Sequence, residues 1–306
     1  MSGFPKGTVV DLINNEKIVI LEMIGSGGTA DIYKVYNLQR KCYQCAKHLY
    51  GNYSAEPKKY YDKLRILSKM SKPHDLFVWS YPDACSRFDE KSRSFLFVME
   101  LLEGYKDLRS IMKNPDILPL KTRIRICLKL AEAADAAIEH SLIYGDWQSK
   151  NVMWKKMPSG EISLKIIDTD GMSLPGHHLG LQGTGKYRAP EILAGGSQTE
   201  QSDIHALATV AFRLLCGRHP LDGRLTRSET ETPASIMKYY CHKPLFIFDG
   251  YENEPSELVK ERFSRLPRIL QLLYRQYFSN RCLMGREDRP DYSVFKIAHE
   301  QAIKVI

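Results

Sequence analysis

The sequence predicts an α+β fold with two lobes, a small β-rich N-terminal lobe over residues 1–103 and a larger helical lobe over residues 104–306. From residue 8 to about 103, short runs rich in Val, Ile and Tyr alternate with turns, a pattern typical of strands. Beyond Gly104 the apolar residues recur at helical spacing. No repeat or long polar linker interrupts the chain, so we expect the two lobes to form one domain.

The elements follow in order along the chain. In the first lobe we expect strands at residues 17–24, 32–37, 43–49 and 95–100, and one helix at residues 57–70. In the second lobe, apolar residues at helical spacing predict an amphipathic helix over residues 122–141, and a hairpin turn is expected at residues 158–160. Residues 206–216 are apolar apart from Thr209 and Arg213, which predicts that the helix over residues 202–217 is buried on most sides.

Composition excludes several classes of protein. No apolar run approaches the roughly 18–20 residues that cross a bilayer, and residues 1–11 lack the apolar core of a signal peptide. Seven scattered cysteines make a poor disulfide framework and fit a reducing, cytoplasmic compartment. The net charge of +8 is spread over the chain without a nucleic-acid-binding motif. We therefore expect neither membrane nor nucleic acid as a partner.

A glycine-rich stretch lies between two predicted strands and contains Gly25, Ser26, Gly27 and Gly28. Glycines let backbone N–H groups turn toward a phosphate without a side chain in the way. Because a strand rather than a helix follows, the stretch differs from a dinucleotide or Walker loop and indicates a flap over phosphates. A plain hairpin turn explains the same glycines equally well.

Lys47 follows Ala46 inside a predicted strand, 20 residues beyond this loop. A lysine in mid-strand usually faces solvent. The glycine-rich stretch before it favours a lysine that reaches inward to a phosphate.

The most informative residues follow the long helix of the second lobe. Asp146 and Asn151 stand five apart on a short loop, and Asp168 ends a strand that follows a hairpin. Together they supply one base and two hard oxygen ligands, which Mg²⁺ prefers alongside phosphate oxygens. In phosphoryl transfer a protein mainly positions groups and neutralises charge. The pattern therefore indicates phosphoryl transfer.

With these residues in order, the chain resembles the protein kinase family over essentially its whole length. Gly25-x-Gly27 resembles the glycine-rich loop, Lys47 the strand lysine, Asp146 the catalytic base, and Asn151 and Asp168 the metal ligands. Residues 183–191, with Thr184 and Glu191, resemble the G-T-x-x-Y-x-A-P-E end of an activation segment. Asp203 opens the buried helix, and Arg289 resembles the late arginine that pairs with that glutamate.

The resemblance implies the fold of a kinase, Mg²⁺ with ATP as cofactors (Mn²⁺ as an alternative ion) and a protein substrate. It also implies an adenine pocket, with the backbones of Glu100 and Leu102 bonding the base and apolar side chains flanking it. Those apolar residues are Ile32, Ala46, Met99 and Met153. Without the resemblance, each of them is a plausible core residue.

The chain departs from the family pattern in several places. Ala30 replaces the third glycine, Gln148 stands where Ser/Thr kinases carry a lysine, and Thr169 replaces the phenylalanine of D-F-G. Tyr144-Gly145 stands where most kinases have His-Arg. Without that arginine, a phosphorylated activation loop lacks its usual bidentate partner, so we expect activity that does not depend on activation-loop phosphorylation.

Two acids compete as the partner of Lys47. Asp62 on the predicted helix is favoured over Glu56, because Pro57 directly after Glu56 indicates a helix start.

Three functions compete. The favoured one is an active Ser/Thr protein kinase, with Asp146, Lys47, Asn151 and Asp168 as catalytic residues. The second is a nucleotide-binding pseudokinase, which Ala30, Gln148 and Thr169 favour somewhat. The third is a small-molecule kinase, because Tyr144-Gly145-Asp146 is similar to an H-G-D loop; the A-P-E segment argues against it.

A narrower resemblance rests on residues 27–33, 217–221 and 244–249, which are similar to bacterial kinases of tellurite-resistance and stress operons. It implies a metal-dependent phosphatase and a von Willebrand factor A protein as partners.

Overall fold

The computed structural model describes residues 3–174, 185–227, 232–250, 252–285 and 287–306. It divides into two compact units. The first comprises Met1–Tyr105 and Ile167–Gly171, and the second comprises Lys106–Ile166 and most of the chain from Met172 onward. The division falls two residues beyond the expected one. In addition, the short segment Ile167–Gly171, expected in the second lobe, packs with the first unit.

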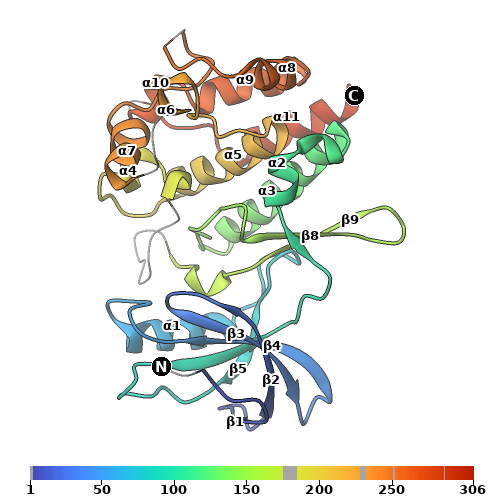
Figure 1. Ribbon diagram of the computed structural model, residues 1–306, viewed down its shortest axis with the longest axis vertical. Coiled ribbons are helices and arrows are strands. Elements are labelled where there is room, and N and C mark those ends of the chain that lie inside the picture. Colours follow the sequence, from blue (N-terminus) through green and yellow to red (C-terminus); the bar gives the residue numbers. More distant parts are fainter. Residues whose placement is uncertain (1–2, 175–184, 228–231, 251, 286) are drawn as a thin grey trace. The chain divides into compact units, whose positions relative to one another are not determined.

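A six-stranded antiparallel sheet forms the first unit, in the order β1-β2-β3-β4-β6-β5 (Figure 1). The strands are β1 (Val9–Asp11), β2 (Lys17–Ser26), β3 (Ala30–Asn37), β4 (Cys42–Leu49), β5 (Ser80–Cys85) and β6 (Phe95–Met99). The four expected strands are present within a few residues of their bounds, whereas β1 and β5 were not predicted.

Both faces of this sheet are covered by apolar side chains. One cluster joins Ile18, Ile20, Val35 and Leu96 across the strands. The other packs the helix α1 (Pro57–Lys69) against β6 through Tyr60, Tyr61 and Leu64. Because side chains alternate along a strand, adjacent β6 residues serve the two clusters, and all five are buried. The helix α1 is thereby held on the face of the sheet toward which Lys47 points.

The second unit begins with a small antiparallel sheet in the order β7-β8-β9. Its strands are β7 (Lys106–Asp107), β8 (Val152–Lys156) and β9 (Ile162–Ile166). The expected turn at residues 158–160 joins β8 to β9, and the Met157 N–H donates to the Glu161 carbonyl at 2.8 Å. This hairpin directly follows the segment that carries Asp146 and Asn151.

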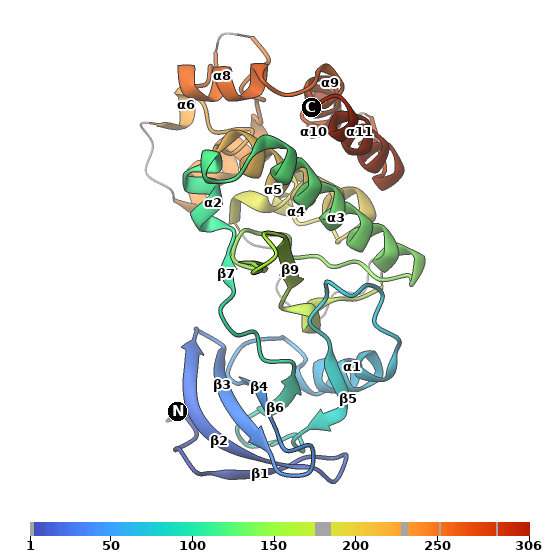
Figure 2. The ribbon, with the colours of Figure 1, turned by 90° about the vertical axis from the view of Figure 1, so that its right-hand side faces the viewer.

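Helices form the rest of the second unit (Figures 1 and 2). They are α2 (Arg109–Lys113), α3 (Leu120–Glu139), α4 (Pro190–Leu193), α5 (Glu200–Cys216), α6 (Arg224–Arg227), α7 (Pro233–Ile236), α8 (Glu257–Ser264), α9 (Arg268–Tyr277), α10 (Asn280–Leu283) and α11 (Tyr292–Lys304). Short 3-10 turns lie at Pro115–Ile117 and Gly185–Tyr187, and a π-helical stretch, η4, at Met237–His242. A further 3-10 turn, Thr169–Gly171, belongs to the first unit.

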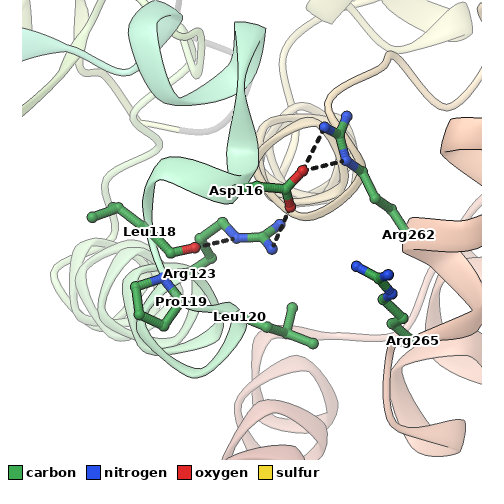
Figure 3. Close-up of a pocket in the computed structure, with 7 residues that line it drawn as sticks. All are labelled: Asp116, Leu118, Pro119, Leu120, Arg123, Arg262 and Arg265. Atoms are coloured by element: carbon green, nitrogen blue, oxygen red, sulfur yellow. Dashed lines mark hydrogen bonds and ion pairs between the residues drawn. The ribbon is translucent and has the colours of Figure 1, made fainter.

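The helix α5 is buried along most of its length, as its composition predicted. Thr199 and Ser202 form a capping box at its start, and Gly217 ends it with φ of 78°. At the same end, the buried Arg123 of α3 donates to the Leu215 carbonyl and pairs with Asp116. Arg262 of α8 reaches the same Asp116 at 2.7 Å (Figure 3). These contacts join α3, α5 and α8 at one end of the buried helix.

No helix within the described residues is long and apolar enough to cross a bilayer. All seven cysteines are free thiols, five of them buried.

Candidate active site

Lys47 lies on β4 in the first unit, buried to 9% exposure. Its Nζ donates to Asp170 Oδ1 at 2.8 Å and to Asp168 Oδ1 at 3.2 Å. The Tyr60 hydroxyl of α1 donates to Asp170 Oδ2 at 2.8 Å. The strand, the helix and the segment Ile167–Gly171 therefore converge on one ammonium group.

The charges in this cluster stabilise one another. Burial alone would lower the pKa of Lys47, but Asp168 and Asp170 outweigh it and raise that pKa. Burial opposes ionisation of Asp170, yet Lys47 and the Tyr60 hydroxyl hold its pKa below the usual value. Burial and the neighbouring Asp170 raise the pKa of Tyr60 well above normal, so its hydroxyl stays a neutral donor. Lys47 is therefore charged and fixed in position, as a phosphate ligand needs to be.

Asp168 has the left-handed φ of 58°, which is uncommon for a residue other than glycine. Its side chain is 43% exposed, whereas that of Asp170 is 6% exposed. Thr169, between them, is anchored because its hydroxyl donates to the Val78 carbonyl at 2.6 Å. Such strain persists only where the surroundings enforce it, and it concentrates at functional sites.

The glycine-rich stretch forms the tight connection between β2 and β3. The Gly27 N–H donates to the Ala30 carbonyl at 2.8 Å, and Ser26, Gly27 and Gly28 are exposed. Asp31 restrains this hairpin by accepting hydrogen bonds from Ser26 Oγ at 2.7 Å and the Tyr50 hydroxyl at 3.1 Å. The backbone of the loop is therefore exposed to solvent, and the Asp31 side chain holds the ends of the loop in place.

The expected adenine residues of the first unit lie on neighbouring strands. Ala46 is fully buried, Met99 ends β6 at 9% exposure, and Ile32 is half-buried on β3. Glu100 and Leu102 follow β6 and are half-buried. In the second unit, Met153 is half-buried on β8.

Asp146 lies in the second unit, on the loop between α3 and β8. Its Oδ2 accepts hydrogen bonds from Gln148 Nε2 and from Asn151 Nδ2, both at 2.8 Å. Asn151 also donates to the Asp146 carbonyl at 3.1 Å. Gln148 and Asn151 are buried while Asp146 is half-buried, so the two amides hold an accessible carboxylate in one orientation.

The loop that carries Asp146 is anchored on α5 through Asp203. Asp203 Oδ1 accepts from the Gly145 N–H at 2.7 Å, and Oδ2 accepts from Trp147 Nε1 and the Tyr292 hydroxyl at 3.0 Å each. Burial raises the pKa of Asp203 to about 6 although these donors oppose the shift. Gly145 has φ of 81°, which a side chain at this position would strain.

Glu191 and Arg289 form a bidentate ion pair, with Arg289 Nη1 2.6 Å from Oε1 and Nη2 2.9 Å from Oε2. The arginine is 4% exposed and also donates to the Gln201 carbonyl. The pair ties the end of the activation-segment motif to the chain that precedes α11.

The family model of the protein kinase domain matches residues 18–276, which is most of the chain. The chain belongs to the protein kinase family. Its two units carry the two lobes of the kinase α+β fold, an N-lobe sheet with one helix and a helical C-lobe.

Relatives of this protein kinase include bacterial and animal proteins. The serine/threonine-protein kinase PrkC of Bacillus subtilis is 27% identical over 225 residues, 71% of this chain and 34% of its own length. The serine/threonine-protein kinase pkn2 of Myxococcus xanthus is 25% identical over 73% of this chain and 27% of its own. The tousled-like 1-B kinase of Danio rerio is 25% identical over 73% and 32%. The chain thus spans about a third of the length of these curated relatives.

One expected contact of this kinase is contradicted by the structure. Asp62 does not pair with Lys47, because it lies on the exposed face of α1 and pairs with Lys58 at 3.1 Å. The runner-up, Glu56, pairs with Lys59 at the start of the helix. The carboxylate that meets Lys47 with both oxygens is Asp170, which was not among the expected site residues. Its place two residues after Asp168 was the available signal.

Thr184, expected in the activation segment, lies outside the described residues. The remaining expected catalytic residues fall into two groups, Lys47 with Asp168 in the first unit and Asp146 with Asn151 in the second.

Each unit offers one oxygen donor of the kind that magnesium binds, and the described residues hold no cluster of three or more His, Cys, Asp or Glu side chains. Asn151 Nδ2 is bound to Asp146, so Oδ1 is the amide atom that remains for a cation. Asp168 is exposed enough for its carboxylate to reach one. Hard oxygen donors of this kind are what Mg²⁺ requires.

Proposed function

We propose that this chain is the catalytic domain of a Mg-ATP-dependent protein kinase that phosphorylates serine or threonine hydroxyls. The observation that carries the proposal is the Asp146 carboxylate, oriented by Gln148 and Asn151 on a loop that the buried Asp203 anchors. A half-buried carboxylate held in one orientation by buried amides is what proton removal from a bound hydroxyl needs.

The proposed roles follow from these positions. Asp146 accepts the proton of the substrate hydroxyl, and the oxygen of that hydroxyl forms a bond to the γ-phosphorus of ATP. The bond between the γ-phosphorus and the oxygen that bridges it to the β-phosphate breaks, and ADP leaves. Lys47 binds the α- and β-phosphates, and Asn151 and Asp168 hold the metal. When bound, magnesium neutralises charge on the phosphate oxygens. The exposed loop at Ser26, Gly27 and Gly28 covers the phosphates. Mn²⁺ is an alternative to Mg²⁺ as the metal ion.

The first unit, with the segment Ile167–Gly171, and the second unit serve as the two lobes of this domain. Adenine binds to the backbones of Glu100 and Leu102, flanked by Ile32, Ala46, Met99 and Met153.

Activity independent of activation-loop phosphorylation is part of the proposal. Gly145 stands directly before Asp146 and supplies only its backbone N–H, which Asp203 accepts. This position therefore carries no guanidinium to bind a phosphorylated loop residue.

The competing function is a nucleotide-binding pseudokinase, and Gln148 is the observation that favours it. An amide donates to Asp146 where a lysine would add positive charge near the transferring phosphate.

The proposal is tested by incubating the protein, first treated with a phosphatase, with ATP, magnesium and a mixed peptide library. Mass spectrometry then reads the modified residues. We expect phosphoserine and phosphothreonine at the same rate with and without the phosphatase treatment. Phosphotyrosine alone, or ATP binding without any transfer, would contradict the proposal, and the second result would support the pseudokinase.

The free thiols and the narrower resemblance extend the proposal to a reducing, cytoplasmic location and to two partners, a metal-dependent phosphatase and a von Willebrand factor A protein. A phosphatase that removes phosphate from products of this kinase would support that extension.

A further inference from the structure

The position of the Lys47 ammonium depends on a carboxylate that the helix α1 does not supply. In protein kinases, an ion pair between the strand lysine and a glutamate of the helix has to be in place for activity. Here α1 has one acid within its bounds, Asp62, and its side chain is 53% exposed. The Lys47 partner must come from elsewhere.

What α1 presents to this site instead is a hydroxyl and an ammonium group. The Tyr60 hydroxyl donates to Asp170 Oδ2. Lys63 Nζ is buried 4.4 Å from the centre of the Tyr60 ring, and no hydrogen-bond partner for it is found among the described residues. The nearby Asp170 carboxylate attracts this second ammonium. Both groups favour a negative charge at Asp170.

The two carboxylates beside Lys47 differ in what else they can do. Asp168 is 43% exposed and meets Lys47 through one oxygen at 3.2 Å. Asp170 is 6% exposed, and both of its oxygens lie within 3.1 Å of Lys47 Nζ. A cation bound at Asp168 would therefore leave the Lys47–Asp170 pair intact.

We infer that Asp170 is the positioning residue for Lys47 and replaces the acid of the helix, with Tyr60 holding Asp170 in turn. The inference rests on the proposed nucleotide site and deepens it. The ion pairs that position Lys47 then come from the segment Asp168-Thr169-Asp170. The helix α1 contributes to it through one neutral hydrogen bond rather than an ion pair.

The test compares the binding of ATP with that of adenosine, by calorimetry and without a divalent ion. Adenosine lacks the phosphates that Lys47 binds, so a general loss of structure weakens both ligands while a misplaced Lys47 weakens only ATP. The variants are Asp170→Asn and, as a matched control on α1, Asp62→Asn. Leaving out the metal separates this readout from the role of Asp168.

We expect Asp170→Asn to weaken ATP about tenfold or more and adenosine less than twofold, since a charge-assisted hydrogen bond is lost. Asp62→Asn should leave both affinities within about twofold, because its pair with Lys58 is exposed. Tyr60→Phe, a second variant that keeps the carboxylate, should weaken ATP by about threefold and leave adenosine unchanged.

The inference is overturned if ATP and adenosine weaken equally in Asp170→Asn and Tyr60→Phe, or if neither variant changes ATP binding. The inference would also be overturned if the wild-type protein bound ATP no more tightly than adenosine. If the expected pattern appears while no phosphate is transferred, the inference stands and the proposed function fails.

Discussion

Asp203 accepts a 2.7 Å hydrogen bond from the backbone N–H of Gly145, the residue directly before Asp146. Through this bond the buried helix α5 fixes the chain that carries the proposed base. The same carboxylate holds Trp147, which is fully buried, and Tyr292 at the start of α11. One side chain therefore joins three parts of the second unit at the catalytic loop.

Asp203→Asn should lower both stability and activity. Its single amide oxygen replaces a carboxylate that accepts from three donors, so at least one donor loses a full-strength partner. We expect the free energy of unfolding to fall by about 2 kcal/mol at pH 7. The turnover number should fall as well, because Asp146 is less well positioned. Urea denaturation and steady-state kinetics measure the two effects.

The stability penalty of Asp203→Asn should depend on pH. The folded pKa of about 6 exceeds the ordinary value of 3.8, so the folded state binds more protons between these values. Wild type therefore loses stability as pH rises through that window, while the asparagine variant has no such loss. The penalty should be about 1 kcal/mol larger at pH 5 than at pH 7. A penalty that shrinks at pH 5 would contradict the shifted pKa.

Lys63→Met should stabilise the protein at neutral pH. Burial lowers the pKa of Lys63 to about 8 from 10.5, so its charge costs free energy in the folded state below about pH 8. The cost fades as pH rises toward 10.5, because the unfolded state then binds the extra proton. Thermal unfolding should show the variant more stable by up to about 3 kcal/mol at pH 7, and by less at pH 9.5. A variant less stable than wild type at pH 7 would show that the ammonium is a stabilising group.

Gln148→Lys should raise the turnover number about tenfold, because a lysine can keep a donor at Asp146 and adds positive charge near the transferring phosphate. The matched control is Gln148→Met, similar in size but without a donor, which should be slower than wild type. Initial rates at saturating ATP decide the question. A lysine variant as slow as the methionine variant would mean that the amide is required at this position.

Glu191→Gln should destabilise the protein by about 2–3 kcal/mol, since it leaves the buried Arg289 without its charged partner. The exposed pair between Lys58 and Asp62 provides the comparison, and Asp62→Asn should cost less than about 0.5 kcal/mol. Chemical denaturation of both variants measures the difference. Equal costs would show that the buried pair contributes no more than a surface pair.

Local patterns in the sequence were enough to predict much of the fold. The helix α5 was predicted because its apolar run has few polar interruptions, and the helix α3 because its apolar residues keep helical spacing. The strands β1 and β5 were not predicted. The first is three residues long, and the second contains Pro82 and Asp83, which are uncommon in strands. Their pairing with neighbours decides their structure.

In the candidate site, too, residues in local motifs could be predicted, whereas contacts decided by tertiary packing could not. Asp146, Asn151 and Lys47 stand in motifs whose order and spacing are visible in the chain. The partner of Lys47 is not visible that way, because the choice between Asp62 and Asp170 depends on which face of α1 is buried. Spacing along the chain favoured an acid on the helix. Tertiary packing turned Tyr60 inward and left Asp62 in solvent.

The central claim is that Asp146 acts as the base of a phosphoryl transfer. The most direct measurement is the rate of transfer of labelled γ-phosphate from ATP by wild type and by Asp146→Asn, with ATP affinity measured in parallel. We predict transfer by wild type, a loss of at least about a hundredfold in the variant, and equal ATP affinity in both. Equal transfer rates would contradict the claim, as would ATP binding without transfer by either protein.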